Sequence, residues 1–397
     1  MGSVQAVAWT RNLCLAVAAV AAGLLVCELL LRLLGISYPI FVWVDPVRGV
    51  AHIPGARGVR QYQGHPVVEI DSDGLRGPEV AVERAAGTFR IALLGDSFIE
   101  AFEVPFEKTV GEVIEGRLSA LRGTPVEVLN FGVGGYGTAQ ELLTLQHDVW
   151  KYSPDLVLLA VTTGNDISDD YRPLNDDYAP YFVFQGPALV LDSSFLGSKQ
   201  YRSRALWTRK LLGVVQHSHL VQLVNRVRVL RRRGERQREN AAGAPGEEVG
   251  LRDEVQLPPI SPDWQEAWRV TEALLTLMRD ECRRNQTPFA IVTLTRGIQV
   301  SPIREKKERF LREIGTTDLY YPERRLDDLG KREGIPVFNL APTMAKLAEE
   351  RQVYFHAFGT QLGVGHWSEE GHRVAGELIA PWIAGGMADS ATVQSHP

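Results

Sequence analysis

The sequence predicts an α/β sandwich with a parallel central sheet, and two observations support this fold class. Apolar runs of five to seven residues recur along the chain, and stretches with helical periodicity separate them. Strands that are apolar along their whole length are typical of sheets buried on both faces. Right-handed crossovers between such strands give a doubly wound, flavodoxin-like arrangement with helices on both sides of the sheet.

The predicted elements alternate in the order that this fold requires. Each strand is a short apolar run bounded by polar or glycine-containing turns, and each helix is longer and amphipathic. In chain order they are a strand at 89–95, a helix at 109–121, a strand at 126–132, a helix at 138–150, a strand at 155–161, a helix at 263–284, a strand at 288–294, a helix at 322–333, a strand at 336–340 and a helix at 369–384.

The composition is that of a globular chain. Of the 397 residues, 45% are hydrophobic and 23% are charged, and the formal net charge is −5. This balance excludes wholesale disorder and argues against a nucleic-acid partner bound through bulk positive charge. Three cysteines exclude a disulfide scaffold and allow no Cys/His metal spacing. We therefore expect no metal, no cofactor and no nucleic acid; the sequence does not indicate protein partners.

An apolar segment near the N-terminus predicts a membrane anchor. Residues 13–34 are apolar except for Glu28 and Arg32, which share a helix face at i, i+4 spacing. As a helix they span about 33 Å, enough to cross the hydrocarbon core of a bilayer. A cleaved signal peptide is the alternative, but its Ala-x-Ala triplets lie inside the apolar run. We expect residues 1–36 to be an uncleaved transmembrane helix that contacts membrane lipid.

The orientation of this helix is argued from two opposing signals. One basic residue precedes the segment and four lie at its end or beyond, so a positive-inside count favours a cytoplasmic body. A short tail before a single apolar segment is instead typical of a signal anchor with an exported domain. We expect the second arrangement, a single-pass membrane protein with an extracytoplasmic catalytic domain.

The rest of the chain divides into a lead-in, a main domain and a tail. Residues 37–87, rich in Pro, Gly and Arg, predict a stalk or a lead-in with short strands. The main domain spans 88–387, with an insertion at about 170–262, and 388–397 form a tail. A basic run within the insertion, Arg226–Glu248, fits either an anionic-lipid or nucleic-acid patch or a solvated helix end with a disordered loop. We favour the solvated helix.

Polar motifs follow three of the predicted strands, and a fourth precedes the last helix. They are Gly95-Asp96-Ser97, Gly132-Val133-Gly134-Gly135, Gly164-Asn165-Asp166 and Gly365-His366-Trp367. In an open α/β sheet, ligands bind outside the carboxyl ends of the strands. We therefore expect all four motifs to meet at one rim of the sheet.

This ordered set resembles the GDSL/SGNH hydrolase superfamily, whose four sequence blocks it matches over residues 88–170 and 285–385. With the N-terminal apolar segment and the sequence DSDGLRG at 71–77, the chain is similar to the membrane-anchored branch of that superfamily. The resemblance implies an SGNH-type three-layer sandwich. It also implies a serine ester hydrolase that forms an acyl-serine intermediate on an envelope carbohydrate or lipid ester.

The resemblance assigns a role to each motif residue. Ser97 would be the nucleophile and His366 the base that activates it, because a serine hydroxyl is a weak nucleophile near neutral pH. The backbone N–H groups of Ser97 and Gly135 and the side-chain amide of Asn165 would stabilise the oxyanion of the tetrahedral intermediate. We expect the residues beside them to bind the acyl-ester substrate: Asp96, Gly134, Asp166 and Trp367.

One position departs from the superfamily pattern. Its members usually carry an Asp two or three residues before the histidine, where this chain has Val364 and Gly363. A backbone carbonyl, Asp166 or an acid from the insertion would then have to orient the imidazole of His366. His356 is a second candidate for the base.

Three functions remain open on this site. Water attacking the acyl-serine gives an esterase, which we favour. A sugar hydroxyl attacking instead gives an O-acyltransferase acting on a surface polysaccharide, and loss of catalysis gives a binding protein on the same scaffold.

Two competing motifs are weaker. Residues 132–137 satisfy G-x-G-x-x-G, but the next strand lacks the ribose-binding acid at its end, and the acidic residues at 166–177 fit a solvated loop better than a cation site. The chain has no G-x-S-x-G elbow.

Overall fold

The computed structural model describes residues 2–60, 63–175, 178–240 and 252–387, and the chain divides into two compact units. Met1–Ile40 and Leu206–Pro245 form one unit, and Phe41–Ala205 and Gly246–Pro397 form the other. This grouping differs from the expected boundaries, because the lead-in joins the main domain from Phe41 onward and the middle of the insertion joins the N-terminal helix. The predicted tail at 388–397 and the linker at 241–248 lie outside the described residues.

The larger unit is built on a five-stranded sheet in which every strand pair is parallel. The order across the sheet is β11-β10-β7-β5-β6, which is the doubly wound order with the first and third strands adjacent at its centre. The predicted parallel α/β sandwich is thus confirmed. The strands are β5 (Phe89–Leu94), β6 (Val126–Asn130), β7 (Leu156–Thr162), β10 (Phe289–Leu294) and β11 (Val337–Asn339).

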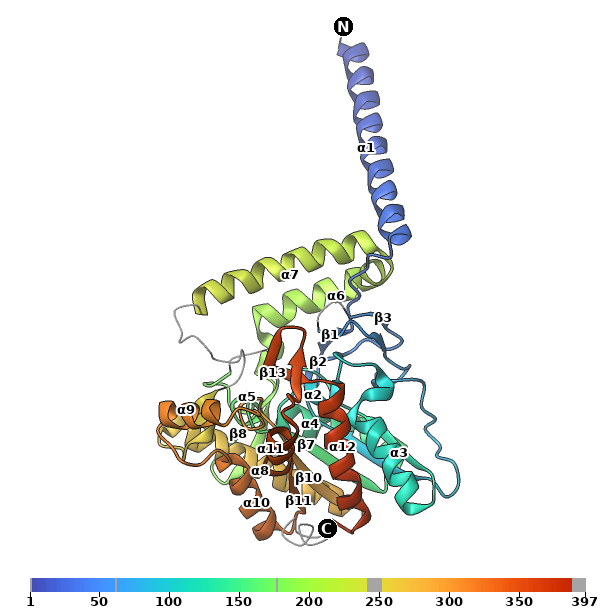
Figure 1. Ribbon diagram of the computed structural model, residues 1–397. Helices are drawn as coiled ribbons and strands as arrows, with labels where there is room; N and C mark the ends of the chain where they lie inside the picture. Colours follow the sequence, from blue (N-terminus) through green and yellow to red (C-terminus); the bar gives the residue numbers. More distant parts are fainter. Residues whose placement is uncertain (1, 61–62, 176–177, 241–251, 388–397) are drawn as a thin grey trace. The chain divides into compact units, whose positions relative to one another are not determined.

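Helices cover both faces of this sheet (Figure 1). One face packs against α4 (Thr138–Thr144), α8 (Pro262–Arg284) and α10 (Tyr321–Glu333). The other face packs against α3 (Val110–Arg122), α11 (Leu340–Arg351) and α12 (Glu369–Ala384). Successive residues of β7 alternate between the two cores, which is why the strand is apolar along its whole length.

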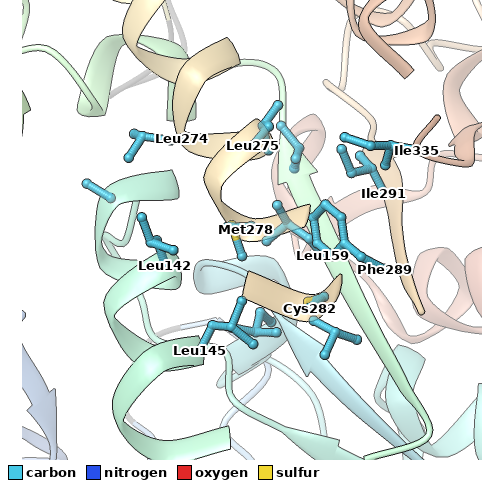
Figure 2. Close-up of a cluster of buried hydrophobic side chains, with 14 of the residues drawn as sticks. Leu142, Leu145, Leu159, Leu274, Leu275, Met278, Cys282, Phe289, Ile291 and Ile335 are labelled. Atoms are coloured by element: carbon cyan, nitrogen blue, oxygen red, sulfur yellow. The ribbon is translucent and has the colours of Figure 1, made fainter. Parts of the chain in front are cut away.

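Figure 2 shows part of the first core, where side chains of α8 meet the sheet. Leu274, Met278 and Cys282 recur at i, i+4 spacing along α8 and pack with Leu142 of α4 and Leu159 of β7. The ends of α8 follow from its sequence. Its N-cap serine accepts a hydrogen bond from a first-turn N–H group, and proline occupies the first turn.

Most predicted helices agree with the structure to within one or two residues, and the helix expected at 138–150 differs. There α4 ends at Thr144 and continues as a π turn (Leu145–Val149) and a 3-10 turn (Trp150–Tyr152). Outside the insertion, the sequence pattern missed α11 and three other helices that have few apolar residues or are very short: α2 (Ser97–Glu100), α5 (Asp166–Asp169) and α9 (Arg304–Ile314). Further 3-10 turns are Phe106–Lys108, Ser194–Gly197 and Asp253–Gln256.

The lead-in forms short antiparallel pairs. Strands β1 (Val42–Asp45) and β2 (Gly49–His52) pair with each other, and so do β3 (Arg57–Val59) and β4 (Val67–Glu69). Val68 is fully buried, and the Tyr136 hydroxyl, from the turn after β6, donates to the carbonyl of Val50 at 2.7 Å. From Phe41 onward this segment is therefore a packed part of the larger unit, whereas an extended stalk would leave its side chains in solvent.

Two further hairpins complete the larger unit. Strands β8 (Tyr181–Gln185) and β9 (Ala188–Asp192) pair within the insertion, and β12 (His356–Phe358) and β13 (Gln361–Trp367) pair just before α12.

The smaller unit contains α1 (Gly2–Leu33), the C-terminal part of α6 (Lys199–His217) and α7 (His219–Asn240). Within α1, Arg11–Leu33 is long and apolar enough to cross a membrane, with a mean hydropathy of 2.5 and no buried share.

Candidate active site

Ser97 lies at the switch point of the sheet, where β5 passes into the short helix α2. Asp96 caps this helix, because its Oδ1 accepts a hydrogen bond from the backbone N–H of Phe98 at 2.9 Å. The Asp96 side chain is fully buried, and burial raises its pKa. Asp96 thus caps the helix that begins at Ser97, and its expected contact with substrate stays a prediction.

The structure brings Ser97 and His366 together. Their Oγ and Nε2 atoms lie 2.9 Å apart, a hydrogen-bond distance, although the residues are 269 positions apart in the chain. His366 sits on β13, and the ring of Phe98 packs beside its imidazole at a centroid distance of 5.2 Å. The His366 side chain remains 27% exposed, so a substrate can reach it from solvent.

Two side-chain oxygens face the other ring nitrogen of His366. Oε1 of Gln63 lies 3.2 Å from Nδ1, and Oε1 of Glu103 lies 3.4 Å from it. A carboxylate and an amide oxygen both accept hydrogen bonds, so we assign the imidazole proton to Nδ1. This tautomer leaves the lone pair of Nε2 free to take the proton of Ser97.

The groups that orient His366 come from parts of the chain that the sequence had not indicated. Gln63 belongs to the lead-in, and Glu103 follows α2 by three residues. Asp166, which was one expected partner, is turned elsewhere: its Oδ2 accepts a hydrogen bond from the backbone N–H of Thr162 at 2.7 Å.

Glu103 is nearly buried, with 4% of its surface exposed. Burial, reinforced by the negative charge of Glu100, raises the pKa of Glu103 to about 8, and the positive charge of Arg60 partly offsets this rise. The lead-in lies directly against this residue, because a Cβ added to Gly64 would stand 1.8 Å from the carbonyl oxygen of Glu103. Only glycine fits at that position, which also has a φ of +60°.

Glu100 connects the lead-in, α2 and the turn after β6. Its Oε1 accepts hydrogen bonds from Nε2 of His52 at 2.9 Å and from the backbone N–H of Gly134 at 3.0 Å. Burial by itself would raise the pKa of Glu100, but the hydrogen bond and charge of His52 lower it. The N–H of Gly134 thus helps to position the turn after β6, and the expected role of this residue in substrate binding stays a prediction.

The three expected oxyanion donors have different settings. Gly135 is exposed at the tip of the turn after β6 with a φ of +84°, a left-handed conformation that favours glycine. Ser97 is the first residue of α2, where backbone N–H groups have no partner within the helix. The amide Nδ2 of Asn165 lies 3.1 Å from Oδ2 of Asp169 and 3.4 Å from Oδ2 of Asp96.

Asp166 and Trp367 are both fully buried, and their expected contact with substrate stays a prediction. The indole Nε1 of Trp367 donates to the hydroxyl of Thr295 at 2.8 Å, and its ring lies in the core beneath Phe98. Asp166 begins α5, and burial raises its pKa. Alternation along β13 explains the tryptophan: the residue after an outward-facing histidine points inward.

His356 is positioned as a structural residue. Its Nε2 contacts the hydroxyl of Thr295 at 2.9 Å and its Nδ1 contacts the carbonyl of Gly365 at 2.6 Å. Burial lowers its pKa to about 4, so the ring is neutral near pH 7. His356 is therefore a buried residue within the hairpin that carries His366, and its two hydrogen-bond partners are Thr295 and Gly365.

The acidic residues after β7 are engaged with protein groups. Asp169 contacts the amides of Asn165 and Asn175, and Asp170 accepts from the backbone N–H of Ala139 and the hydroxyl of Thr271. Among the residues that the structure describes, no group of three or more His, Cys, Asp or Glu side chains is arranged to hold a metal ion. Two members of the predicted cluster, at 176 and 177, lie outside those residues.

Sequence reasoning missed Glu103 and Gln63, and only the first carries a local signal. Glu103 stands between Phe102 and Val104, which are both buried. Because carboxylates are rarely buried without a partner, a single acid within an apolar run indicates a candidate site residue. Gln63 has no such signal, because a polar residue in a loop near Gly and His is unremarkable.

No protein-family model and no curated protein sequence matches this chain. Several solved structures are similar to it. One is a lipolytic protein of the G-D-S-L family, by its description, from Desulfitobacterium hafniense. The two chains are 13% identical, the match covers 74% of this chain and 98% of that chain, and the TM-score is 0.35.

Two other solved structures have comparable values. Axe2, an acetylxylan esterase from Geobacillus stearothermophilus, is 10% identical, with 76% of this chain and 95% of that chain covered and a TM-score of 0.36. The lipase/acylhydrolase from Enterococcus faecalis is 13% identical, with 75% and 96% covered and a TM-score of 0.36. Such low values do not determine an activity, which has to be inferred from this chain's own residues.

Proposed function

We propose that this protein is a serine ester hydrolase with Ser97 as nucleophile and His366 as general base. The observation that carries the proposal is the 2.9 Å contact between Ser97 Oγ and His366 Nε2, with two acceptor oxygens on the opposite ring nitrogen. A nucleophile bonded to a base, and a base oriented by a third group, is the arrangement that activates a serine hydroxyl.

The reaction follows from this geometry in two halves. As Ser97 Oγ attacks the ester carbonyl, its proton passes to Nε2 of His366, and the imidazolium that forms is stabilised by Glu103 at Nδ1. The imidazolium then protonates the departing alcohol, which leaves an acyl-serine. Water enters, gives a proton to Nε2 and attacks the acyl carbon; collapse of that intermediate returns the proton to Ser97 and releases the acid.

The negative oxygen of each tetrahedral intermediate requires hydrogen-bond donors fixed in advance. We assign this role to the N–H groups of Ser97 and Gly135 and to the amide of Asn165. Glu100 supports the assignment, because it is a residue of α2 that also binds the N–H of Gly134, next to Gly135. Fixed donors of this kind contribute roughly 3–4 kcal/mol each to lowering a barrier.

The apolar helix α1 supports a proposal about where this reaction takes place. We propose that α1 anchors the enzyme in a membrane, with the catalytic unit on the extracytoplasmic side and an envelope carbohydrate or lipid ester as substrate. Its length and composition suit a single span. An O-acyltransferase would use the same serine and histidine, with a sugar hydroxyl in place of the water that attacks the acyl-serine.

The test uses the full chain in detergent micelles. Hydrolysis of p-nitrophenyl acetate and labelling by a fluorophosphonate, which needs only an activated serine, are compared for wild type, Ser97→Ala and His366→Ala. Matched controls are Ser203→Ala and His147→Ala, which alter exposed residues outside the site. We expect both site variants to lose turnover by at least about a thousandfold, with unchanged thermal unfolding.

The paired readouts separate the alternatives. Labelling of Ser97 without hydrolysis, followed by turnover when a sugar acceptor is added, would favour the acyltransferase. A folded wild-type protein that neither hydrolyses the ester nor reacts with the fluorophosphonate would refute an activated serine altogether.

A further inference from the structure

The N-terminus of α7 is tied to the end of the apolar helix α1. The carboxylate of Glu28 accepts hydrogen bonds from the hydroxyl of Ser218 at 2.9 Å and from the backbone N–H groups of His219 and Leu220 at 3.0 and 2.9 Å. Arg32 completes the junction, since its Nε donates to Glu28 at 2.8 Å. Glu28 thus acts as an N-cap that is supplied by another helix.

This junction lies inside the candidate membrane span. Arg11–Leu33 is the apolar stretch, and Glu28 is five residues before its end. At 1.5 Å per residue, the start of α7 is therefore within about 8 Å, measured along α1, of the point where α1 leaves the hydrocarbon. If α1 crosses a bilayer, α7 begins at the level of the interface.

One side of α7 packs on the chain that continues beyond α1. Gln222 is buried, and its Oε1 accepts a hydrogen bond from the backbone N–H of Tyr38 at 2.9 Å. Arg226, one turn later, lies over the Tyr38 ring at 6.0 Å. Tyr38 follows the end of α1 by five residues, so this side of α7 faces away from the bilayer.

The opposite side of α7 therefore faces the membrane surface, and its side chains have the chemistry of an interfacial helix. Val224 and Val227 are 62% and 42% exposed, a large aliphatic surface for a helix in water. Arg228 and Arg231 are exposed on the same side. Helical residues advance by about 100° each, which groups these four within roughly a quarter of the circumference. Val224, Val227, Arg228 and Arg231 are called the outer face below.

We propose that α7 lies on the membrane that α1 crosses, with its outer face bound to anionic phospholipid. The valines enter the boundary between headgroups and acyl chains, and the arginines extend their aliphatic stems along it and pair with headgroup phosphates. Membrane binding by α7 does not require the proposed esterase activity. It requires only the contacts within the smaller unit and a membrane-inserted α1. It replaces the solvated-helix interpretation of the basic run for the residues that the structure describes.

The experiment measures lipid contact directly in the full chain. A single cysteine carrying an NBD fluorophore is placed by Val227→Cys, and the matched control is Asn225→Cys, which lies about 200° around the same helix. Cys14→Ala and Cys27→Ala remove the exposed thiols, while Cys282 is buried with a pKa raised by burial to about 12 and stays unreactive. Both proteins are reconstituted in phosphatidylcholine vesicles with or without about one quarter phosphatidylglycerol, and quenching by lipids with a nitroxide near the headgroup is recorded.

We expect the nitroxide lipid to quench the fluorophore at 227 severalfold more than at 225, with a larger difference in vesicles that contain phosphatidylglycerol. Arg228→Glu with Arg231→Glu should reduce the ratio of docked to undocked helix by about fivefold per arginine in those vesicles. Equal quenching at both positions would overturn the proposal. Stronger quenching at 227 that ignores both lipid charge and the arginine exchange would also overturn it, because anionic lipid would then not be the partner.

Discussion

Replacing Glu103 with glutamine tests the role of the buried acid beside His366. The change keeps the size of the side chain and an acceptor oxygen, and it removes only the negative charge. In the wild type that charge lies 3.4 Å from Nδ1 of His366. At an effective dielectric constant of about 20, Coulomb's law gives an attraction of about 5 kcal/mol between a full carboxylate and a full imidazolium at this distance.

Part of this attraction will be lost to solvent screening at the exposed edge of the histidine. We therefore expect Glu103→Gln to raise the barrier by about 2–4 kcal/mol when the wild-type acid is ionised, which is roughly a 30- to 1000-fold loss in kcat/KM. Gln63 remains as an acceptor at Nδ1 in both proteins.

The effect of Glu103→Gln on kcat/KM should increase with pH. The pKa of Glu103 is raised to about 8, so the acid is roughly one-tenth ionised at pH 7 and nine-tenths ionised at pH 9. The ratio of wild-type to variant kcat/KM should accordingly rise about tenfold between those pH values. The same pKa shift affects stability. Between about pH 4.5 and pH 8 Glu103 keeps its proton in the native state but loses it in the unfolded chain, so the free energy of unfolding of the wild type should fall as the pH rises through this range. The Glu103→Gln variant should lack that fall.

The assay is p-nitrophenyl acetate hydrolysis from pH 6 to 9, with Ser97→Ala as the blank for spontaneous hydrolysis. Glu112→Gln is the matched control, because burial also raises the pKa of Glu112, to about 7, on a helix outside the site. A ratio that stays constant from pH 7 to pH 9, or a folded Glu103→Gln protein as active as wild type at pH 9, would refute the reasoning.

Three other substitutions test how the site is held. His52→Ala leaves the buried Glu100 carboxylate without its hydrogen-bond partner and should cost about 3–5 kcal/mol in urea unfolding at pH 7. The cost should be smaller near pH 4, because burial alone raises the pKa of Glu100 and the acid of the variant can then take up a proton. Gly132→Ala places a Cβ 2.4 Å from the Glu100 nitrogen and should destabilise by about 1–3 kcal/mol, whereas Gly116→Ala, with open space around it, should be neutral or stabilising by the same measurement. Trp367→Phe removes a buried hydrogen bond and should lower the free energy of unfolding by about 1–3 kcal/mol, while the KM for ester stays within a factor of two if no substrate touches this ring.

The lead-in segment explains why these substitutions are coupled to the site. It supplies His52 to Glu100 and Gln63 to His366, and its Gly64 lies on the backbone of Glu103. A segment that the sequence predicts as a stalk or lead-in therefore supports the histidine that we propose as the base. Truncating it should disturb catalysis, and because Leu75 of this segment packs in the first core, truncation should also lower the free energy of unfolding.

The sequence by itself determined the fold class, and the resemblance of its motifs to the GDSL/SGNH superfamily predicted Ser97 and His366 as the central pair. Apolar runs and helical periodicity are local patterns, and for parallel strands they imply the order of layers and the edge where Ser97 and His366 meet. Both residues stand at element ends, where a polar residue is informative because the neighbouring residues are buried.

Tertiary structure alone decided which groups reach Nδ1 of His366 and which neighbouring side chains lie in the core. Glu103 and Gln63 reach the ring from 263 and 303 positions away in the chain, and such contacts leave no trace in local periodicity. Trp367 is adjacent to the histidine in sequence but points into the core, since successive side chains of a strand face opposite ways. The pairing of Glu28 with the start of α7 is likewise a contact across about 190 positions, and only the folded chain brings this carboxylate to a helix end that needs an acceptor.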